Sequence, residues 1–176
     1  PYSAKGLQIA AMKDDDPVVI FQSTRLMGVN FDQHVPEEAY ELPIGKSRIV
    51  KTGDDVTLIG IGTTTRTCMQ AAESLSKQGY QAEVVDLLSI SPIDEETILS
   101  SISKTRKVVI VDEDYPKCSV ASEISALAAE KAFDLLDAPP KRVTAPHASI
   151  PYSSVLEQLH FPSVEKVTAA CLEVIN

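Results

Sequence analysis

A short apolar strand that leads directly into a helix constrains this chain more than any other segment. Residues 56–62 read VTLIGIG, a β-branched run preceded by two aspartates, which is typical of a strand buried on both faces. Three threonines able to cap a helix follow, and then come apolar residues at helical spacing, namely Cys68, Met69, Ala71, Ala72 and Leu75. Gly79 supplies a left-handed stop. The segment predicts the first half of a βαβ unit.

The turn between this strand and this helix contains Gly60 and Gly62, which resemble the start of the G-x-G-x-x-G pattern of dinucleotide sites. The third glycine would fall at Thr65, where a side chain would oppose close packing of helix on strand. We therefore interpret the segment as a structural turn. The alternative is an anion site at the Thr63–Thr65 turn, because the first N–H groups of a helix can bind an anion.

Strands and helices alternate through the rest of the chain after residue 45. Further strands are predicted at residues 47–52, 82–88, 107–111 and 142–144, and further helices at residues 94–102, 119–136 and 163–175. Asp94, Ser119 and Ser163 are placed to begin these helices. The alternation predicts an α/β fold of three layers, with a mainly parallel sheet and helices on both of its faces.

The first 44 residues follow a different pattern. Residues 3–13 predict a helix capped by Ser3, and residues 18–22, VVIFQ, predict a buried strand. Residues 23–46 are polar, lack periodicity and contain several glycines and prolines, so we expect a linker there. We place a domain boundary near Ile44 and Gly45, which divides the chain into residues 1–44 and 45–176.

Composition excludes several classes of function. The net charge of −9 and the lack of a lysine–arginine cluster argue against binding to nucleic acid. The sequence contains no stretch apolar enough to span a bilayer, so no membrane association is expected. Cys68, Cys118 and Cys171 are odd in number and far apart, which fits core residues in a reducing compartment better than a disulfide or zinc site.

The candidate functional residues are expected at the C-terminal ends of the strands, since ligands of parallel sheets bind at that edge. The segments expected there are Thr63–Thr65, Leu88–Ser91, Asp112–Tyr115 and Ala145–Tyr152. His147 could act as a general base oriented by Asp112, Glu113 or Asp114, or it could simply bond to backbone in its loop. No serine elbow, H-E-x-x-H or phosphate loop occurs. From the residues alone, the domain lacks a self-contained active site.

Three adjacent carboxylates, Asp14, Asp15 and Asp16, follow the first predicted helix. Negative charge is unfavourable at the C-terminal end of a helix dipole. Two interpretations remain open: a solvated turn, or a cation held by carboxylate and carbonyl oxygens.

Several stretches, taken together and in collinear order, resemble one protein family along essentially the whole chain. They are PYSAKGLQIAAMKDDDPVVIFQ, LPIGKSRIVKTGDDVTLIGIG, EVVDLLSISPIDEETILSSISKT and LLDAPPKRVTAPHASIPYSSVLEQ, with the closing helix. The family is the beta subunit of the thiamine-diphosphate-dependent decarboxylating component of 2-oxo acid dehydrogenase complexes, whose C-terminal half the chain resembles. The last stretch is more similar to acetoin and pyruvate dehydrogenases than to the branched-chain enzyme.

The resemblance implies that residues 1–44 are the tail of a pyrimidine-binding domain plus its linker, and that residues 45–176 are a transketolase C-terminal-like domain. It also implies that the glutamate that activates thiamine diphosphate and the active-site histidine lie upstream of Pro1. On that basis we expect no catalytic or cofactor-binding residue here, with thiamine diphosphate and magnesium bound elsewhere in the intact enzyme. His147 inherits no catalytic role.

One site of the family carries over by resemblance. Some of these subunits hold potassium at the end of the helix before PVV, which implies Ala11, Met12, Asp14 and Asp16 as metal ligands here. Relatives often have asparagine at the position of Asp16, and a further ligand would come from the missing part of the domain.

The resemblance further implies a role in assembly. The expected partners are an alpha subunit, a second beta subunit and the dihydrolipoamide acyltransferase core, which acidic residues including Glu165 and Glu173 would help to dock. The expected location is the cytoplasm in a bacterium, and the mitochondrial matrix or plastid in a eukaryote. Two further hypotheses stay open: a free-standing ligand-binding or regulatory module with an anion site at Thr63–Thr65, and an independent enzyme with His147 as base.

Overall fold

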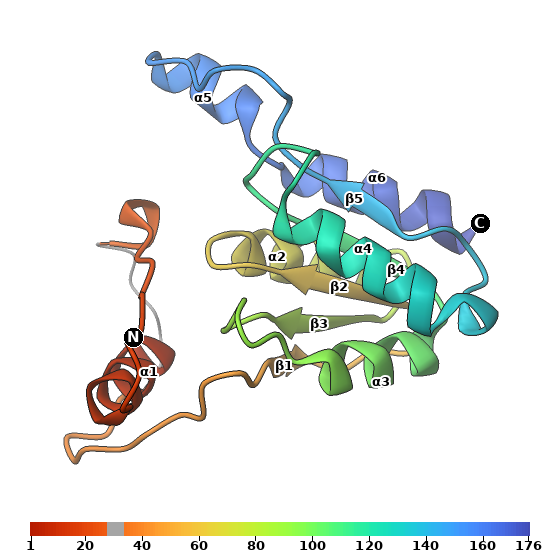
Figure 1. The fold of residues 1–176 in the computed structure, drawn as a ribbon. Helices are drawn as coiled ribbons and strands as arrows, with labels where there is room; N and C mark the ends of the chain where they lie inside the picture. The colour runs from red at the N-terminus through yellow and green to blue at the C-terminus, as the bar shows by residue number, and fades with distance from the viewer. Residues whose placement is uncertain (28–33) are drawn as a thin grey trace.

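The chain folds around a five-stranded sheet with strand order β1-β3-β2-β4-β5 (Figure 1). The computed structural model describes residues 1–27 and 34–176. Strand β1 (Arg48–Lys51) runs antiparallel to β3 (Ala82–Asp86). Strands β2 (Val56–Gly60), β3, β4 (Val108–Val111) and β5 (Lys141–Val143) are mutually parallel. The mainly parallel α/β sheet predicted from the sequence is confirmed.

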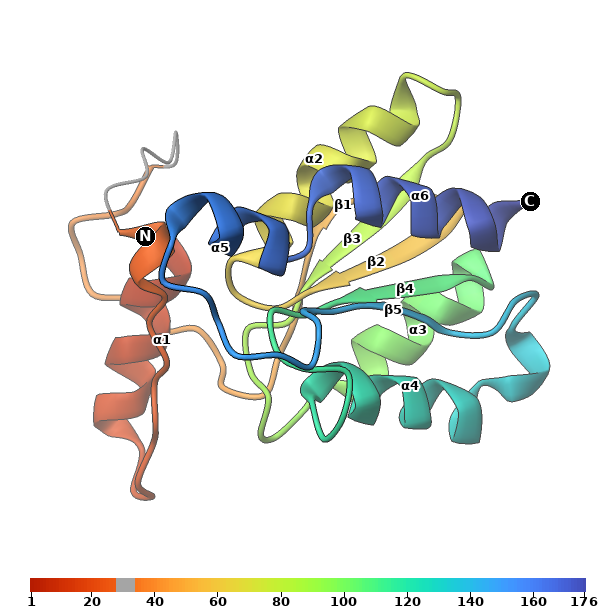
Figure 2. The ribbon, with the colours of Figure 1, turned by 90° about the horizontal axis from the view of Figure 1, so that it is seen from above.

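Two helices cover each face of the sheet, which makes three layers (Figure 2). Helices α2 (Thr64–Ser76) and α6 (Val164–Ile175) share one apolar core with Leu58 and Val84. Helices α3 (Glu95–Thr105) and α4 (Val120–Lys131) share the other with Ile59 and Ile110. Because both faces are covered, every residue of β2, β3 and β4 is buried, as their apolar runs predicted.

The turn from β2 into α2 is built around a close approach of backbone to backbone. A Cβ on Gly60 would lie 2.5 Å from the Cα of Thr65, so only glycine fits. Gly62 has a φ of +59° and Gly79 a φ of +91°, the left-handed conformation that glycine tolerates best. The predicted stop at Gly79 is confirmed.

The helix start differs in detail from the prediction. Thr63 occupies the N-cap position, but its side chain makes no capping hydrogen bond. The hydroxyl of Thr64 instead accepts from the Ile61 N–H at 2.8 Å and donates to the Val111 carbonyl at 2.7 Å. One side chain thereby ties the turn to the end of β4.

Other helix boundaries follow the sequence closely. Ser119 and Ser163 accept hydrogen bonds from Ser122 N and Lys166 N, so both predicted caps are confirmed. Helix α4, however, ends at Lys131 and is followed by the 3₁₀ turn η2 (Phe133–Leu135), so the predicted continuation to residue 136 is wrong.

The helix does not continue to residue 136 because Asp137 is hydrogen-bonded to Arg106, which lies outside α4. The Asp137 N–H donates to the carbonyl of Arg106, whose guanidinium binds the Asp137 carboxylate at 2.8 and 2.9 Å. A short helix, α5 (Ser154–His160), lies between β5 and α6 and was not predicted.

Residues 1–27 lie beyond the carboxyl edge of the sheet. The predicted helix there is α1 (Tyr2–Lys13), but Pro1 occupies its N-cap position and Ser3 lies inside it, so the predicted Ser3 cap is wrong. After α1, the residues predicted as a strand, 18–22, are extended but form no strand, and Val19 and Phe21 are 76% and 82% exposed. The apolar pattern of a buried strand is present, but among the described residues no strand pairs with it. The 3₁₀ turn η1 (Thr24–Leu26) follows.

Helix α1 packs against residues 36–42. The rings of Tyr2 and Tyr40 stack with centroids 4.6 Å apart, and the Leu42 N–H donates to the Gly6 carbonyl at 3.3 Å. The ammonium of Lys5 donates to the carbonyls of Glu37 and Glu38, each at 3.0 Å. The proposed division into residues 1–44 and 45–176 stays a prediction, and residues 28–33 of the expected linker lie outside the described residues.

The buried cysteines behave as core residues. Cys68 of α2 and Cys171 of α6 are fully buried in the core, as predicted, whereas Cys118 is exposed. Burial raises the pKa of Cys171 to about 12, so this thiol stays protonated at neutral pH. Within the described part of the chain, none of the helices has the length and apolar character needed to cross a membrane.

Adding a methyl group at Gly60 tests the close approach of β2 and α2. Gly60→Ala should lower the free energy of unfolding by about 3 kcal/mol, because its Cβ meets backbone atoms that cannot move aside cheaply. Gly62→Ala is the matched control: it has free space around its Cβ and should lose only about 1 kcal/mol for its left-handed φ. Urea denaturation measures both, and equal losses would contradict the packing account.

Candidate functional site

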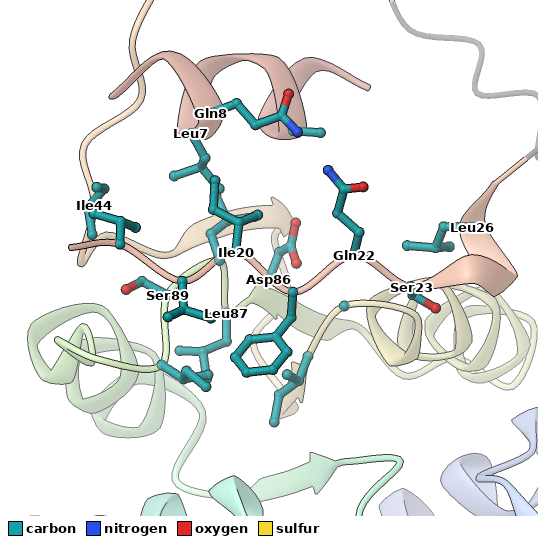
Figure 3. A pocket seen from close by; sticks show the side chains of 18 of the residues that line it. Leu7, Gln8, Ile20, Gln22, Ser23, Leu26, Ile44, Asp86, Leu87 and Ser89 are labelled. Carbon is teal, nitrogen blue, oxygen red and sulfur yellow. The ribbon is translucent and has the colours of Figure 1, made fainter. Parts of the chain in front are cut away.

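The carboxyl edge of the sheet, where the parallel strands end, opens into a cavity of about 730 Å³. The segment 18–23 and helix α1 line one side of it, and residues 61–62 and 86–91 line the other (Figure 3). Ile20 lies over Leu87, and Gln8 and Gln22 bring amide groups to the space (Figure 3). The cavity is therefore mostly apolar with a few polar groups.

Asp86 is the one acidic side chain among the residues that line this cavity. Its carboxylate accepts from the Thr65 hydroxyl at 2.8 Å and from the Arg48 guanidinium at 3.0 Å. Burial raises the pKa of Asp86 above its ordinary value, while the hydrogen bonds from Thr65 and Arg48 act in the opposite direction. The position of Asp86 follows from the register, since it ends β3 beside Gly60 of β2.

This carboxylate bears on the anion alternative at Thr63–Thr65. The hydroxyl of Thr64 is committed to Ile61 and Val111, and that of Thr65 donates to Asp86. A phosphate at the start of α2 would meet a carboxylate already hydrogen-bonded to this turn. Because the phosphate and the Asp86 carboxylate would both be negative and would repel each other, the geometry argues against a phosphate or nucleotide site here.

His147 lies at the same edge, but the carboxylates do not orient it. Its ring packs against Tyr115 with centroids 5.0 Å apart, beside a small cavity of about 240 Å³. Asp112 accepts from the N–H groups of Asp114 and Ala121, and Glu113 pairs with Arg25 at 2.6 Å. No hydrogen bond joins His147 to these carboxylates among the described residues. The geometry therefore offers no acid–base pair at this histidine.

The expected metal ligands lie around the C-terminal end of α1. Ala11 and Met12 belong to its last turn, whose carbonyl oxygens have no partner within the helix. Asp14 ends the helix, and one of its carboxylate oxygens accepts from the Asp16 N–H at 3.0 Å. Carbonyl and carboxylate oxygens suit a hard cation. In the described ranges, however, no group of three or more His, Cys, Asp or Glu side chains is placed to hold a metal.

The two glutamates expected to dock a basic partner lie on the last helix. Glu165 is exposed in the first turn of α6, where its own N–H and the Ser163 hydroxyl lower the pKa of its carboxyl. Glu173 is also exposed and pairs with Lys141 at 2.6 Å. Part of the charge of Glu173 is thereby balanced within the chain.

Residues 45–167 match the family described as transketolase, C-terminal domain. The chain belongs to this family. The match covers the whole sheet, helices α2 to α5 and the first turn of α6, so the fold and the family agree.

Curated relatives match the whole chain of this family member. It is 46% identical to the acetoin:2,6-dichlorophenolindophenol oxidoreductase subunit beta of Bacillus subtilis, over 100% of this chain and 51% of that protein. It is 41% identical to the mitochondrial pyruvate dehydrogenase E1 component subunit beta of Dictyostelium discoideum, over 99% of this chain and 50% of that protein. The chain therefore spans about half the length of these relatives.

The fold is also similar to that of a solved structure, with a TM-score of 0.66 and 25% sequence identity. That structure is described as a split gene transketolase, inactive beta4 tetramer. The alignment covers 77% of this chain and 44% of that one. The resemblance inferred from the sequence motifs is thus confirmed by both the sequence relatives and the fold.

Two features at the carboxyl edge were not predicted from the sequence. Arg25 pairs with Glu113 and lies 4.4 Å from the centre of the Phe161 ring, so it joins η1 to the domain. No local sequence pattern predicts such a long-range contact. Helix α5 exposes Val155, Leu156 and Leu159, and here a signal existed, because their spacing marks one face of a helix.

Removing the hydrogen bond from Thr65 should change the pKa of Asp86. Thr65→Val removes a donor that favours the charged carboxylate, so the pKa of Asp86 should rise further above its ordinary value. Because the unfolded pKa is unchanged, the variant should lose more stability than the parent as pH rises from the unfolded pKa through the folded one. Carboxyl-detected NMR titration reads the pKa. Thr63→Val is the control, since no hydrogen bond joins Thr63 to Asp86, and an unchanged pKa in Thr65→Val would contradict the assignment.

Proposed function

We propose that the chain is the C-terminal part of the beta subunit of a thiamine-diphosphate-dependent 2-oxo acid or acetoin dehydrogenase component. The observation that carries this proposal is the match of all 176 residues to the beta subunit of an acetoin oxidoreductase, together with 41% identity to a pyruvate dehydrogenase beta subunit. Oxidative decarboxylation of pyruvate, or cleavage of acetoin, is then the reaction class of the intact enzyme.

In this proposal the chain contributes assembly rather than chemistry. Thiamine diphosphate and its magnesium bind in the other half of the subunit and in the alpha subunit. The carboxyl edge supports this division, because Asp112 accepts from the Ala121 N–H of α4, Glu113 pairs with Arg25, and the ring of His147 packs at a tilt against Tyr115. None of these groups is arranged to exchange protons with a substrate.

The exposed apolar segment 18–21 fits the same proposal. An extended run with the composition of a buried strand gains stability only when other strands pair with it. We assign those strands to the upstream part of a pyrimidine-binding domain, of which residues 1–44 are the tail and linker. The alpha subunit and a second beta subunit would then assemble around the joined domains, in the cytoplasm of a bacterium or in the mitochondrial matrix or plastid of a eukaryote.

Reconstitution of the intact enzyme tests the function. The full-length subunit that contains this chain, combined with its alpha subunit, should oxidise pyruvate or acetoin with 2,6-dichlorophenolindophenol as acceptor, and only when thiamine diphosphate is present. His147→Ala should leave kcat within about twofold, because this histidine lacks an acid–base partner. A loss of tenfold or more would favour the histidine-dependent enzyme, at about 1.4 kcal/mol of transition-state stabilisation for each tenfold. Absence of any cofactor-dependent oxidation would overturn the proposal.

The potassium site is a second part of the proposal and rests on the ligand set at the end of α1. Carbonyls of Ala11 and Met12, with Asp14 and Asp16, would supply four of the oxygens, and the upstream half would supply the rest. Bound potassium would also offset the negative end of the helix dipole.

Thermal unfolding of the intact subunit reads this site without an activity assay. Potassium chloride should raise Tm relative to choline chloride at equal ionic strength, since a cation that binds only the native state stabilises it. Asp14→Asn should abolish the difference, whereas Asp15→Asn, outside the proposed ligand set, should retain it. The same Tm in both salts would remove the potassium site while leaving the enzyme assignment intact.

Docking to the dihydrolipoamide acyltransferase core is the third part. A chain of net charge −9 favours a basic binding module, and Glu165 and Glu173 lie exposed on α6. Titration against the isolated peripheral-subunit-binding module should show affinity that falls steeply with salt, because the attraction is between exposed charges. Glu165→Gln should weaken binding more than Glu157→Gln, which alters a carboxylate outside α6. Affinity that is independent of salt would contradict the electrostatic account.

A further inference from the structure

Residues 1–27 are joined to the sheet and its helices at two places, which lie on opposite sides of the cavity of about 730 Å³. One connection is covalent, since the chain reaches the sheet through Ile44, which lines one end of the cavity (Figure 3). The other lies beside Ser23 and Leu26, which line the opposite end (Figure 3). A part that is joined covalently at one end and by side-chain contacts at the other can swing about the covalent end.

Arg25 supplies the polar contacts of the second place. Its guanidinium pairs with the Glu113 carboxylate at 2.6 Å and lies 4.4 Å from the centre of the Phe161 ring. Glu113 belongs to the loop between β4 and α4, and Phe161 lies between α5 and α6, so one side chain reaches two separate segments. In the described ranges, no other hydrogen bond or ion pair joins residues 1–27 to residues 45–176. Arg25 is therefore the one polar tether between those ranges.

The covalent connection is a short segment between two sets of contacts. On one side of it, residues 36–42 pack against α1 through the stacked tyrosine rings and the hydrogen bond to the Gly6 carbonyl. On the other side, the Ser47 N–H donates to the Asp94 carboxylate at 2.7 Å, which fixes the chain to the start of α3. The segment left between them is residues 43–45. A few loop residues of this kind are sufficient for a hinge.

We propose that Arg25 is the latch of a hinge between residues 1–42 and 46–176, and that its release opens the cavity between them. A guanidinium suits this task because one planar group can pair with a carboxylate and lie over an aromatic ring. The contact is partly exposed, since the side chains of Arg25 and Glu113 are 48% and 29% exposed. Exposed ion pairs are weak and are screened by salt, so the closed arrangement is readily reversed.

Hydrogen exchange of the intact subunit, detected by mass spectrometry, tests the latch. Arg25→Gln should raise the exchange rates of residues 24–27 and of residues 112–116 together, each about threefold, because the two segments lose the contact that they share. Glu113→Gln should raise the exchange rate of residues 24–27 in the same way, although the change lies in the other part of the chain. The amides of β2 should exchange at the parent rate in both variants, which excludes general unfolding.

Lys13→Gln is the matched control for these variants. It also removes an ion pair, but its partner Glu41 lies on the same side of the hinge. Exchange of residues 24–27 and 112–116 should therefore stay at the parent rate.

A pair of spin labels reads the opening itself. Asp15 is exposed on one side of the hinge and Phe133, 72% exposed, lies on the other, so each accepts a label after substitution by cysteine. The exposed Cys118 is replaced by serine, as is any other exposed cysteine of the intact subunit. The doubly labelled parent should give one narrow distribution of distances. Arg25→Gln should broaden this distribution toward longer distances, and about 1 M sodium chloride should do the same to the parent.

Two results would overturn the inference. One is an Arg25→Gln variant in which only residues 24–27 exchange faster and residues 112–116 do not, since the contact would then be local. The other is a distance distribution that neither Arg25→Gln nor salt alters. Both measurements are made without substrate, so the enzymatic proposal fails separately, through absence of cofactor-dependent oxidation in the reconstituted enzyme.

Discussion

The approach of Gly60 to Thr65 is the contact on which the arrangement of this domain depends. It brings α2 down onto the sheet closely enough for Thr64 to reach the Val111 carbonyl and for Thr65 to reach Asp86. Those bonds join the ends of β2, β3 and β4 at one edge. The polar groups at that edge are thereby consumed by the fold itself, which is the physical reason that a turn resembling a dinucleotide fingerprint offers no place for a phosphate.

At this edge the hydroxyls of Thr64 and Thr65 and the carboxylate of Asp86 are already hydrogen-bonded within the fold. The same holds for Asp112, which accepts from the Ala121 N–H of α4, and for Glu113, which pairs with Arg25. What the edge does present is apolar area: the cavity under residues 18–23 and the exposed apolar side chains of α5. The chain belongs to the transketolase C-terminal family and is similar along its whole length to a beta subunit.

The parts that sequence reasoning predicted are those whose partners lie nearby along the chain. Apolar runs such as 56–60 and 108–111, and the caps at Ser119 and Ser163, are determined by local periodicity and by hydrogen bonds within one turn. The prediction of a strand at residues 18–22 failed because a strand needs a neighbouring strand, and a local sequence pattern does not show whether one is present. Arg25 was missed because its partner Glu113 is 88 residues away. The sequence left open whether a carboxylate orients His147 for a related reason: adjacency to carboxylates at one edge does not fix where each carboxylate bonds.

The two segments that break the rule of apolar inside and polar outside break it at the same end of the molecule. Burying a side chain such as Val, Leu or Phe is worth roughly 1.5–3 kcal/mol, so leaving Val19, Phe21, Leu156 and Leu159 in water forgoes several kcal/mol. A sequence that retains such side chains, while directing Glu157 partly inward, is consistent with a native state in which other protein covers them. Binding that covers these residues only in the folded chain would also stabilise the fold, so assembly and stability are coupled at this edge.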